Sequence, residues 1–275
     1  MVSGPFVYAV ALLAVPLGAI VLFSFWTQDY LTLITEPTIA NYREAWEEPL
    51  YGLLLRRSLI IAALVTLATV VLAFPIAYYV SFNVRPGRKS LWLFLITIPF
   101  WTSYLIRVFL WKVILGFNGV LNSGLQGIGV IEEPLTFILY NANAVVITLA
   151  HAFAPFAILP IFVALERIDR SLLEASRDLG ESKLMTFWRV TLPLAMPGVV
   201  AAVLIVFIPT IGDYVTPRLV GGPEGTMIAN MIQVQFLRLY NAPMGAALAV
   251  FALGSVSVIA LLFVWLNRKF LRVQQ

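Results

Sequence analysis

Asp213 is the residue whose type and position most clearly suggest chemistry. It is the one acidic residue inside the long apolar runs of the sequence, within the run 195–218. A carboxylate is costly to place among apolar residues and is commonly retained for a function. Its charge would attract a cation, and the neighbouring Tyr214 adds an aromatic face and a hydroxyl that suit the same ligand. The alternative is a structural role, in which Asp213 forms a hinge and bonds to neighbouring groups.

Three aromatic residues in the apolar run 90–115 form a second candidate group. Trp101 lies three residues before Tyr104, and Trp111 lies seven residues after it. On one continuous helix this spacing would place all three on a common face. They could line a path for a cation. Packing in an aromatic core or in an interfacial belt is the simpler interpretation.

Basic side chains inside the apolar runs need a different explanation. Arg107 and Lys112 also lie in the run 90–115, where a positive charge facing the path would repel a cation. We expect both to reach the outer interface along their apolar stems or to pair with an acid. His151 is the single histidine, early in the run 141–165, and no metal-ligand constellation accompanies it. A buried, hydrogen-bonded role is predicted for it rather than proton transfer.

The sequence contains none of the motifs that mark a nucleotide-binding or hydrolytic site. It has no Gly-rich phosphate loop with a lysine, no nucleophile elbow and no HExxH pair. It also has no cysteine, so it forms neither disulfides nor thiolate metal sites. We therefore expect no catalytic residue, cofactor or metal in this chain. Any ATP and Mg²⁺ that its activity requires would be bound by another chain.

The composition indicates that lipid is the solvent for much of the protein. The 275 residues are 61% hydrophobic and 12% charged, with a mean hydropathy of +0.93. A soluble domain usually carries about 25% charged residues. A helix needs roughly 20 apolar residues to span the hydrocarbon core. Six runs are long enough, at approximately 5–26, 58–82, 90–115, 141–165, 195–218 and 243–266.

These runs predict a single all-α membrane domain over residues 1–275, because the segments between them are too short for a second folded domain. The first run lacks a clear small-x-small cleavage site and is longer than the roughly 7–15 apolar residues of a signal peptide. We interpret it as a retained span, with a cleaved signal as the alternative.

Local signals add detail to this picture of six helices. Ile39–Tyr51 is predicted to form a short surface helix, and Gly and Asn residues predict irregular structure over 116–140. Proline inside a run removes a backbone hydrogen bond and favours a kink. Such prolines are Pro75, Pro99, Pro155, Pro160 and Pro209.

The distribution of charge predicts the orientation of the chain. Basic residues are retained on the cytoplasmic side of a membrane. The segments after the second, fourth and sixth runs lie on one side and hold eleven Lys or Arg residues, against five on the other side. The other side carries most of the acidic residues. Both termini are therefore predicted to be cytoplasmic, with Arg56 and Arg57 as a local exception.

The cytoplasmic segment 166–198 has the most informative pattern, ERIDRSLLEASRDLGESKLMTFWRVTLPLAMPG. Ser171 and Glu174 match a capping box, which begins a helix, and Gly180 is suited to end that helix in a left-handed conformation. A second short helix is predicted from near Ser182, with Pro193 stopping it or starting the turn into the next span. The segment is therefore expected to form a helix–turn–helix.

Two surfaces could accept this helix–turn–helix. An amphipathic segment can rest on lipid, but a lipid-binding helix is more one-sidedly basic than this one. Here acidic residues nearly balance the basic ones. A docking surface for a protein partner fits the pattern better.

The same segment resembles the "EAA" loop of the permeases of binding-protein-dependent ABC importers. That pattern is E-A-A, three residues, G, nine residues, I, one residue, L-P. The sequence departs from it only at Ser176 and Val190 and keeps every spacing, with Gly180 and Leu192-Pro193 in place. The resemblance implies that the loop inserts into a groove on a cytoplasmic ATPase subunit. The coupling residues would be Glu174, Ala175, Ser176, Leu179 and Gly180.

A narrower resemblance covers most of the chain from the second span onward. IPFWTSYLIRVFLWKVIL, within 97–115, and IGDYVTPRLVGG, at 211–222, are similar to segments of the permeases of spermidine/putrescine importers. This implies the type I ABC importer permease fold in a bacterial inner membrane. The implied partners are a second, related permease chain, two copies of an ABC ATPase that bind ATP and Mg²⁺, and a periplasmic substrate-binding protein. No nucleic acid is expected.

Three other functions remain open from the sequence. An importer for another small solute, such as sulfate, ferric iron, a phosphonate or an opine-like compound, would have the same loop, because the loop contacts the ATPase and not the cargo. An ion-coupled secondary transporter would have unwound helices at a midplane ion site and would not explain the loop spacing. A membrane-bound receptor or enzyme would need a site that the sequence does not show.

Overall fold

The computed structural model describes residues 3–30 and 32–271 of the chain. Within these residues, six helical segments are long and apolar enough to cross a membrane, which confirms the predicted all-α protein with six transmembrane helices. These segments are Phe6–Ser24, Pro49–Phe82, Tyr104–Gly127, Ala142–Glu166, Lys183–Gly212 and Ala242–Leu266.

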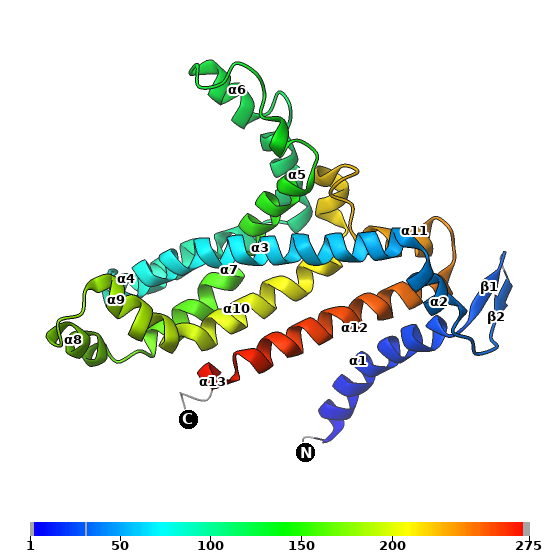
Figure 1. The fold of residues 1–275 in the computed structure, drawn as a ribbon, viewed down its shortest axis with the longest axis horizontal. Helices are drawn as coiled ribbons and strands as arrows, with labels where there is room; N and C mark the ends of the chain where they lie inside the picture. Colours follow the sequence, from blue (N-terminus) through cyan, green and yellow to red (C-terminus); the bar gives the residue numbers. More distant parts are fainter. Residues whose placement is uncertain (1–2, 31, 272–275) are drawn as a thin grey trace.

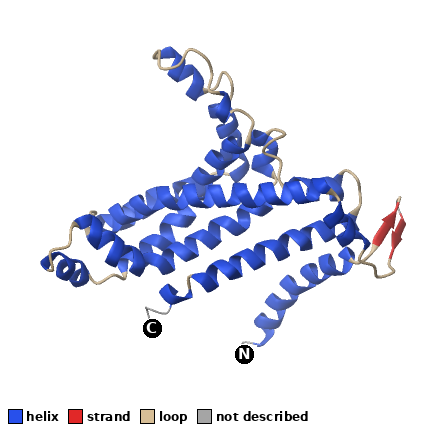
Figure 2. Ribbon diagram, in the orientation of Figure 1, coloured by secondary structure: helices blue, strands red, loops and turns tan. Residues whose placement is uncertain are grey.

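The elements follow one another mostly as helices joined by short turns (Figure 2). In the first half of the chain they are α1 (Ser3–Ser24), β1 (Thr27–Asp29), β2 (Thr32–Ile34), α2 (Ala40–Glu47), α3 (Pro49–Phe82), α4 (Pro86–Thr97), η1 (Ile98–Trp101), α5 (Tyr104–Leu115), α6 (Val120–Gly127) and η2 (Thr136–Ile138). In the second half they are α7 (Ala142–Glu166), α8 (Arg170–Asp178), α9 (Lys183–Thr186), η3 (Phe187–Thr191), α10 (Leu192–Gly212), η4 (Pro217–Gly221), α11 (Ile228–Leu237), α12 (Ala242–Leu266) and α13 (Arg268–Leu271). The strands pair antiparallel, with Gln28 opposite Leu33.

The long helices lie side by side along the longest axis of the molecule (Figure 1). α3, α7 and α10 pack together, and α1 packs against α12 on the outside of the bundle. The short helices α8 and α9 lie at one end of the bundle, and the β1–β2 hairpin and α2 lie at the other. α5 and α6 form an arm that projects away from the bundle.

The core is built where α3, α7 and α10 meet. Val65 on α3, Leu149 and Ile161 on α7, and Val206 on α10 are buried in one apolar cluster. This cluster requires close approach of α7 and α10 at Gly198. A Cβ atom there would lie 2.5 Å from the Pro160 carbonyl oxygen and 2.6 Å from the Ala164 Cβ. The missing side chain at this position therefore sets the distance between the two helices.

Replacing Gly198 with leucine should prevent the protein from folding. The added side chain would meet backbone rather than a mobile side chain, and overpacking of this kind costs about 3 kcal/mol or more. Gly254 on α12 provides the matched control, because a Cβ atom there would meet nothing within 4 Å. The measurement is the amount of monodisperse protein extracted from membranes. Equal yields of the two leucine variants would contradict the packing described here.

The second span begins earlier than the sequence predicted. α3 starts at Pro49 rather than at residue 58, and Glu48 caps it by accepting a hydrogen bond from the Leu50 amide. Consequently, the predicted surface helix over 39–51 is split into α2 and the first turn of α3. Arg57 lies on this extension and donates hydrogen bonds to the carbonyls of Pro223 and Thr226. This role accounts for a basic residue at this edge of the span.

The third span is broken, which corrects the continuous helix predicted over 90–115. α4 ends at Thr97, the 3₁₀ turn η1 follows, and α5 begins only at Tyr104. Pro99 lies in η1, where its lack of an N–H removes a helical hydrogen bond. The break directs α5 out of the bundle as the base of the arm.

The segment 116–140 is more ordered than the sequence predicted. It contains α6 and η2, and the buried Asn122 organises the chain between them. The Asn122 side chain donates to the Gly116 carbonyl and accepts from the Leu135 amide. One asparagine thus fixes two distant points of a loop whose composition indicated irregular structure.

Candidate functional site

The predicted site residues lie in two separate places. Asp213, Tyr214 and Tyr104 surround a cleft near the base of the α5–α6 arm, whereas the predicted coupling residues lie on and directly after α8, at the far end of the bundle (Figure 1). The two places are described in turn.

Asp213 lies at the end of a helix and not inside one, which corrects the span predicted to continue to residue 218. α10 ends at Gly212, and Asp213 has an extended backbone with φ −76° and ψ 119°. Its Oδ1 atom accepts hydrogen bonds from the amides of Val215, at 2.9 Å, and Thr216, at 3.4 Å. The carboxylate thereby caps the helical turn that leads into η4.

The second carboxylate oxygen of Asp213 joins α10 to α5. Tyr104, the first residue of α5, donates its hydroxyl proton to Asp213 Oδ2 at 2.5 Å. The same hydroxyl lies 2.7 Å from Thr216 Oγ1. Asp213 is therefore held by hydrogen bonds on both oxygens, as expected for a carboxylate kept inside a membrane domain. The break in the third span and the end of the fifth span therefore meet at this carboxylate.

The cleft beside Asp213 has a volume of about 530 Å³. Its polar lining includes Thr102, Tyr104, Arg107, Asp213 and Tyr214. Its apolar lining is formed by Phe100, Ala152, Phe153, Phe156, Pro209, Gly212 and Val215. Aromatic rings around a single carboxylate are a suitable environment for a desolvated cation.

Arg107 bonds to backbone carbonyls and pairs with no acid among the described residues, which corrects the expected ion pair. Its guanidinium donates to the carbonyls of Pro99, Thr102 and Ala152. The first two carbonyls belong to the break between α4 and α5. Irregular backbone within a membrane domain needs such partners. Arg107 therefore stabilises the break, and its charge is directed to backbone carbonyls inside the same cleft.

The break separates Trp101 from the other two candidate aromatic residues of the third span, Tyr104 and Trp111, which both lie on α5. Trp101 belongs to η1 and is 79% exposed, with its ring edge against Phe94. Trp111 lies on α5 and donates its indole N–H to His151 Nδ1 at 3.1 Å. Neither tryptophan lines the Asp213 cleft. The break removes the helical spacing between Trp101 and Tyr104, whereas Trp111 stays on α5 with Tyr104, seven residues further along.

His151 is hydrogen-bonded, as predicted, but it is not buried within this chain. It lies on the exposed side of α7 and packs against the ring of Trp111, with the ring centroids 5.2 Å apart. The pair holds the second half of α5 against α7.

The second candidate site begins with α8, whose N-terminus corrects the predicted capping box. Asp169 caps the helix by accepting a hydrogen bond from the Ser171 amide at 3.0 Å. This backbone hydrogen bond lowers the pKa of the Asp169 carboxyl below its usual value. Ser171 and Glu174 therefore lie inside the helix and do not cap it. Aspartate is a strong N-cap residue and precedes the serine by two positions.

The end of α8 follows the prediction. Gly180 has a φ of +86°, its amide donates to the Arg177 carbonyl at 2.9 Å, and the Glu181 amide donates to the Ser176 carbonyl at 3.2 Å. These two hydrogen bonds form a Schellman motif, which requires a left-handed residue at the position of Gly180. They fix the direction in which the chain leaves α8.

Ser182 caps the second short helix, as predicted, but Pro193 does not stop it. The Ser182 hydroxyl accepts from the Met185 amide, and the helix continues from α9 through η3 into α10. η3 is a π-helical turn, in which the Leu192 amide bonds to the Phe187 carbonyl. A wider turn relieves the clash of a proline ring with the preceding carbonyls, so the helix passes Pro193 without ending.

Four of the five predicted coupling residues form an exposed face. Glu174, Ala175, Leu179 and Gly180 are exposed, and Leu179 is 85% exposed. Ser176 is buried instead, with its hydroxyl 3.0 Å from Thr186 Oγ1, and it ties α8 to α9.

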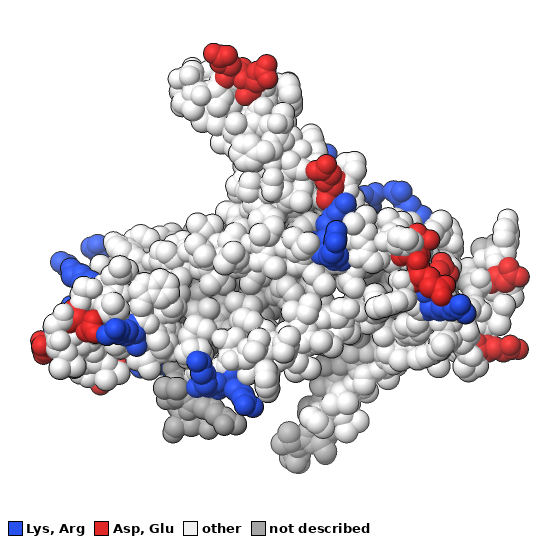
Figure 3. Space-filling view, viewed as in Figure 1, with Lys and Arg blue, Asp and Glu red and all other residues white. Residues whose placement is uncertain are grey.

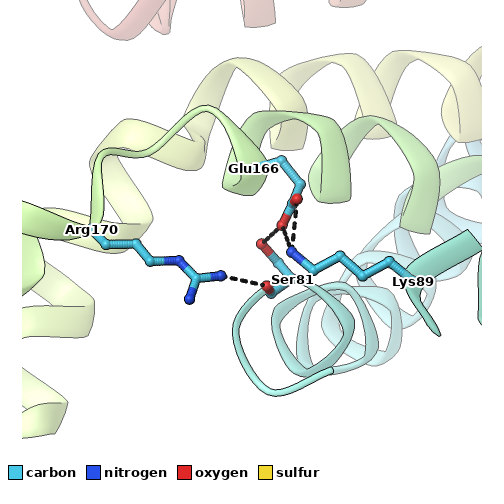
Figure 4. Close-up of polar contacts among 4 residues, drawn as sticks. All are labelled: Ser81, Lys89, Glu166 and Arg170. Atoms are coloured by element: carbon cyan, nitrogen blue, oxygen red, sulfur yellow. Dashed lines mark hydrogen bonds and ion pairs between the residues drawn. The ribbon is translucent and has the colours of Figure 1, made fainter. Parts of the chain in front are cut away.

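A polar cluster that sequence reasoning did not identify lies where the ends of α3, α4 and α7 meet the start of α8. Glu166, at the end of α7, contacts Ser81 of α3 and Lys89 of α4, and Arg170 of α8 donates to the Ser81 carbonyl (Figure 4). These residues are far apart in the sequence, so no local spacing signals the cluster.

Figure 3 shows charged side chains on this face at the α8–α9 end, near α13, near α2 and on the arm, while much of the side of the bundle is uncharged.

Comparisons with known proteins agree on one family. The family model described as "Binding-protein-dependent transport system inner membrane component" matches residues 6–272. The chain is 40% identical over 255 residues to the spermidine/putrescine transport system permease protein PotB of Escherichia coli (strain K12), covering 90% of each chain. It is 36% identical over 272 residues to the protein of the same name from Haemophilus influenzae, covering 96% of this chain and 93% of that one.

Solved structures share the fold at lower identity. A bacterial alginate ABC transporter, in complex with an alginate pentasaccharide-bound periplasmic protein, contains a chain with a TM-score of 0.73 and 18% identity, covering 99% of this chain and 94% of that one. The MetNI methionine ABC transporter contains one with a TM-score of 0.60 and 21% identity, covering 82% and 99%. These similarities confirm the predicted type I ABC importer permease fold. The chain therefore belongs to the family of binding-protein-dependent transport system inner membrane components, as a multi-pass permease and not an enzyme.

Proposed function

We propose that this chain is the permease subunit of an ABC importer for polyamines such as spermidine and putrescine. The observation that carries this proposal is the 40% identity over 90% of both chains to a permease named for those two solutes. The family model matches residues 6–272, which include both the Asp213 cleft and the segment around α8.

The geometry of the Asp213 cleft supports a cationic cargo. Asp213 supplies the negative charge, Tyr104 holds that carboxylate in place, and Tyr214 offers an exposed ring on the same cleft. A polyamine is a flexible chain of ammonium groups separated by methylenes, so it suits a lining of one carboxylate among apolar and aromatic side chains. Trp101 and Trp111, which lie outside this lining, are no longer included in the proposed pathway.

The proposed assembly contains chains that bind the nucleotide and deliver the cargo. A second, related permease completes the pore, two ABC ATPase subunits bind ATP and Mg²⁺ on the cytoplasmic side, and a periplasmic protein delivers the polyamine. In the orientation that the distribution of basic residues predicts, both termini and α8 would be cytoplasmic. The exposed residues Glu174, Ala175, Leu179 and Gly180 would contact the ATPase.

The proposed mechanism is alternating access. Docking of the loaded binding protein and closure of the ATPase dimer on ATP would displace α8 and turn the pore outward. Hydrolysis would return it to the inward-facing state. Each step requires that the two arrangements differ in free energy by an amount that ATP or cargo can supply.

A second candidate within the same class is an importer of another small solute. The observation that favours it is Arg107, whose guanidinium lies in the same cleft as Asp213 and reduces the net negative charge there. Because its N–H groups are directed to the carbonyls of Pro99, Thr102 and Ala152, we consider the cationic cargo the better fit.

The test is ATP hydrolysis by the complete complex in lipid nanodiscs with its loaded binding protein. The panel comprises putrescine, spermidine, sulfate, ferric ion and amino-acid conjugates. Stimulation by polyamines alone is the expected result. Stimulation by another solute alone would retain the importer but remove the polyamine as its cargo.

A further inference from the structure

The polar cluster of Ser81, Lys89, Glu166 and Arg170 joins four helix ends that are separate in the sequence. Ser81 is the second-last residue of α3, Lys89 lies in the first turn of α4, Glu166 ends α7, and Arg170 begins α8. Hydrogen bonds join all four residues (Figure 4). The Ser81, Lys89 and Glu166 side chains bond to one another, and the Arg170 side chain bonds to the Ser81 backbone carbonyl. The cluster is therefore a junction between the bundle and the segment that carries the proposed coupling residues.

Glu166 is the central acceptor of this junction. Its Oε1 atom accepts from Ser81 Oγ at 2.6 Å and from Lys89 Nζ at 2.6 Å, and its Oε2 atom accepts from Lys89 Nζ at 2.8 Å. The Lys89 side chain is only 13% exposed, and that of Glu166 is 34% exposed. Removing one partner would leave a largely desolvated charge without its counter-ion. The pair is therefore far more constrained than a solvated surface pair.

The junction matters most for α4, which has no buried residue along its length. Leu93 and Ile96 are partly buried and pack against the core. The ring of Trp92 packs against that of Tyr79, with the ring centroids 5.8 Å apart. Few buried contacts within this chain therefore fix the orientation of α4. The Lys89–Glu166 pair is a direct link from α4 to the end of α7.

α8 is tied to the same point. Residues 167–169 separate α8 from Glu166, and within this short linker Ile168 is buried together with Leu173 of α8 in the main core cluster. Arg170 adds a hydrogen bond of 3.4 Å to the Ser81 carbonyl. A displacement of α8 should therefore move Glu166, because only three residues connect the two.

α4 leads from this junction to the cleft. It continues through η1 and the break to Tyr104, whose hydroxyl bonds to Asp213. We propose that Lys89 and Glu166 are positioning residues that make α4 move together with α7 and α8, so that displacement of α8 reaches the break and the Asp213 cleft. The inference rests on the proposed function, because it assumes that an ATPase displaces α8.

Spin labels test the movement directly, because the chain has no cysteine. Cysteines replacing the exposed Ser90 of α4 and Ser171 of α8 would carry the labels. In the otherwise unchanged complex, the distance between the labels should stay the same when ATP is trapped. In the K89M and E166Q variants, which remove one charge without reversing it, the distance should shift or broaden on trapping. Unchanged distances in both variants would overturn the proposal, whatever solute the importer carries.

Charge reversal supplies the functional test. K89E and E166K should each lower the solute imported per ATP hydrolysed by about tenfold, within the usual range of coupling effects. The K89E/E166K swap should recover most of this loss, with basal hydrolysis unchanged. The matched control is R43E/E47R, because that pair on α2 is also close, at 2.7 Å, but is 76% and 60% exposed.

The outcomes separate the inference from the proposed function. Wild-type coupling in both single variants, or a swap no better than either, would overturn the positioning role. A wild-type complex that no polyamine stimulates would instead contradict the polyamine cargo, and the spin-label distances would still decide the role of Lys89 and Glu166. If K89E fails to assemble, the neutral K89M and E166Q variants give the same comparison.

Discussion

Replacing Gly180 with proline is expected to abolish ATP-driven uptake while leaving the protein in the membrane. Gly180 has a φ of +86°, whereas proline fixes φ near −65° and has no N–H to donate to the Arg177 carbonyl. The Schellman motif cannot form, so the chain leaves α8 in another direction. A proline in a conformation that it cannot adopt costs about 3 kcal/mol or more, which corresponds to roughly a 100-fold loss. The measurements are polyamine uptake and copurification of the ATPase.

The control for this prediction is Gly180→Asn. Asparagine tolerates the left-handed conformation better than other non-glycine residues, and a Cβ atom at this position meets nothing within 4 Å. The asparagine variant should therefore retain most of its activity. Normal uptake by the proline variant would show that the end of α8 does not couple the permease to the ATPase.

Replacing Asp213 with asparagine is expected to lower polyamine uptake by about tenfold or more, because a hydrogen bond or ionic contact to a charged group contributes roughly 1.5–3 kcal/mol. Asparagine preserves the size of the side chain, and its carbonyl can still accept from the Val215 and Thr216 amides. The negative charge is lost, and the amide nitrogen that replaces Oδ2 donates to the Tyr104 hydroxyl, which can then donate to Thr216 Oγ1. Assembly with the ATPase and basal hydrolysis should not change, and uptake kinetics in proteoliposomes would measure the effect.

Two further variants separate the charge of Asp213 from its capping role. Asp213→Ala removes both the charge and the cap, whereas Tyr104→Phe removes the hydrogen bonds of the hydroxyl to Asp213 and Thr216 and keeps the charge. If the charge contacts the cargo, the asparagine and alanine variants should both lose uptake, and the phenylalanine variant should lose less. If asparagine transports at the wild-type rate and alanine does not, Asp213 acts only as a helix cap.

The sequence was sufficient for the features that depend on local chemistry. Six apolar runs required six spans, because backbone groups in lipid must be satisfied within helices. Gly180 and Ser182 were correctly placed because a left-handed helix end and a hydroxyl N-cap each depend on one residue type at one position. The spacing of Glu174, Gly180 and Pro193 indicates the permease family from the sequence alone.

Features that depend on distant contacts could not be predicted. The break after Thr97 follows from Pro99, but it also requires the guanidinium of Arg107 one turn into the next helix. The position of Asp213 at a helix end depends on Tyr104, which is 109 residues away in the sequence. The Lys89–Glu166 pair spans 77 residues. Neither hydropathy nor motif spacing indicates such pairings.

Uptake of labelled spermidine into proteoliposomes would test the central claim most directly. The liposomes would contain the complete complex, with ATP sealed inside and the loaded binding protein outside. We predict accumulation of spermidine against its gradient with ATP and none with a non-hydrolysable analogue, while labelled sulfate and ferric ion do not accumulate. Equal spermidine uptake with and without hydrolysable ATP, or ATP-driven accumulation of another solute alone, would contradict the assignment of this chain as a polyamine importer permease.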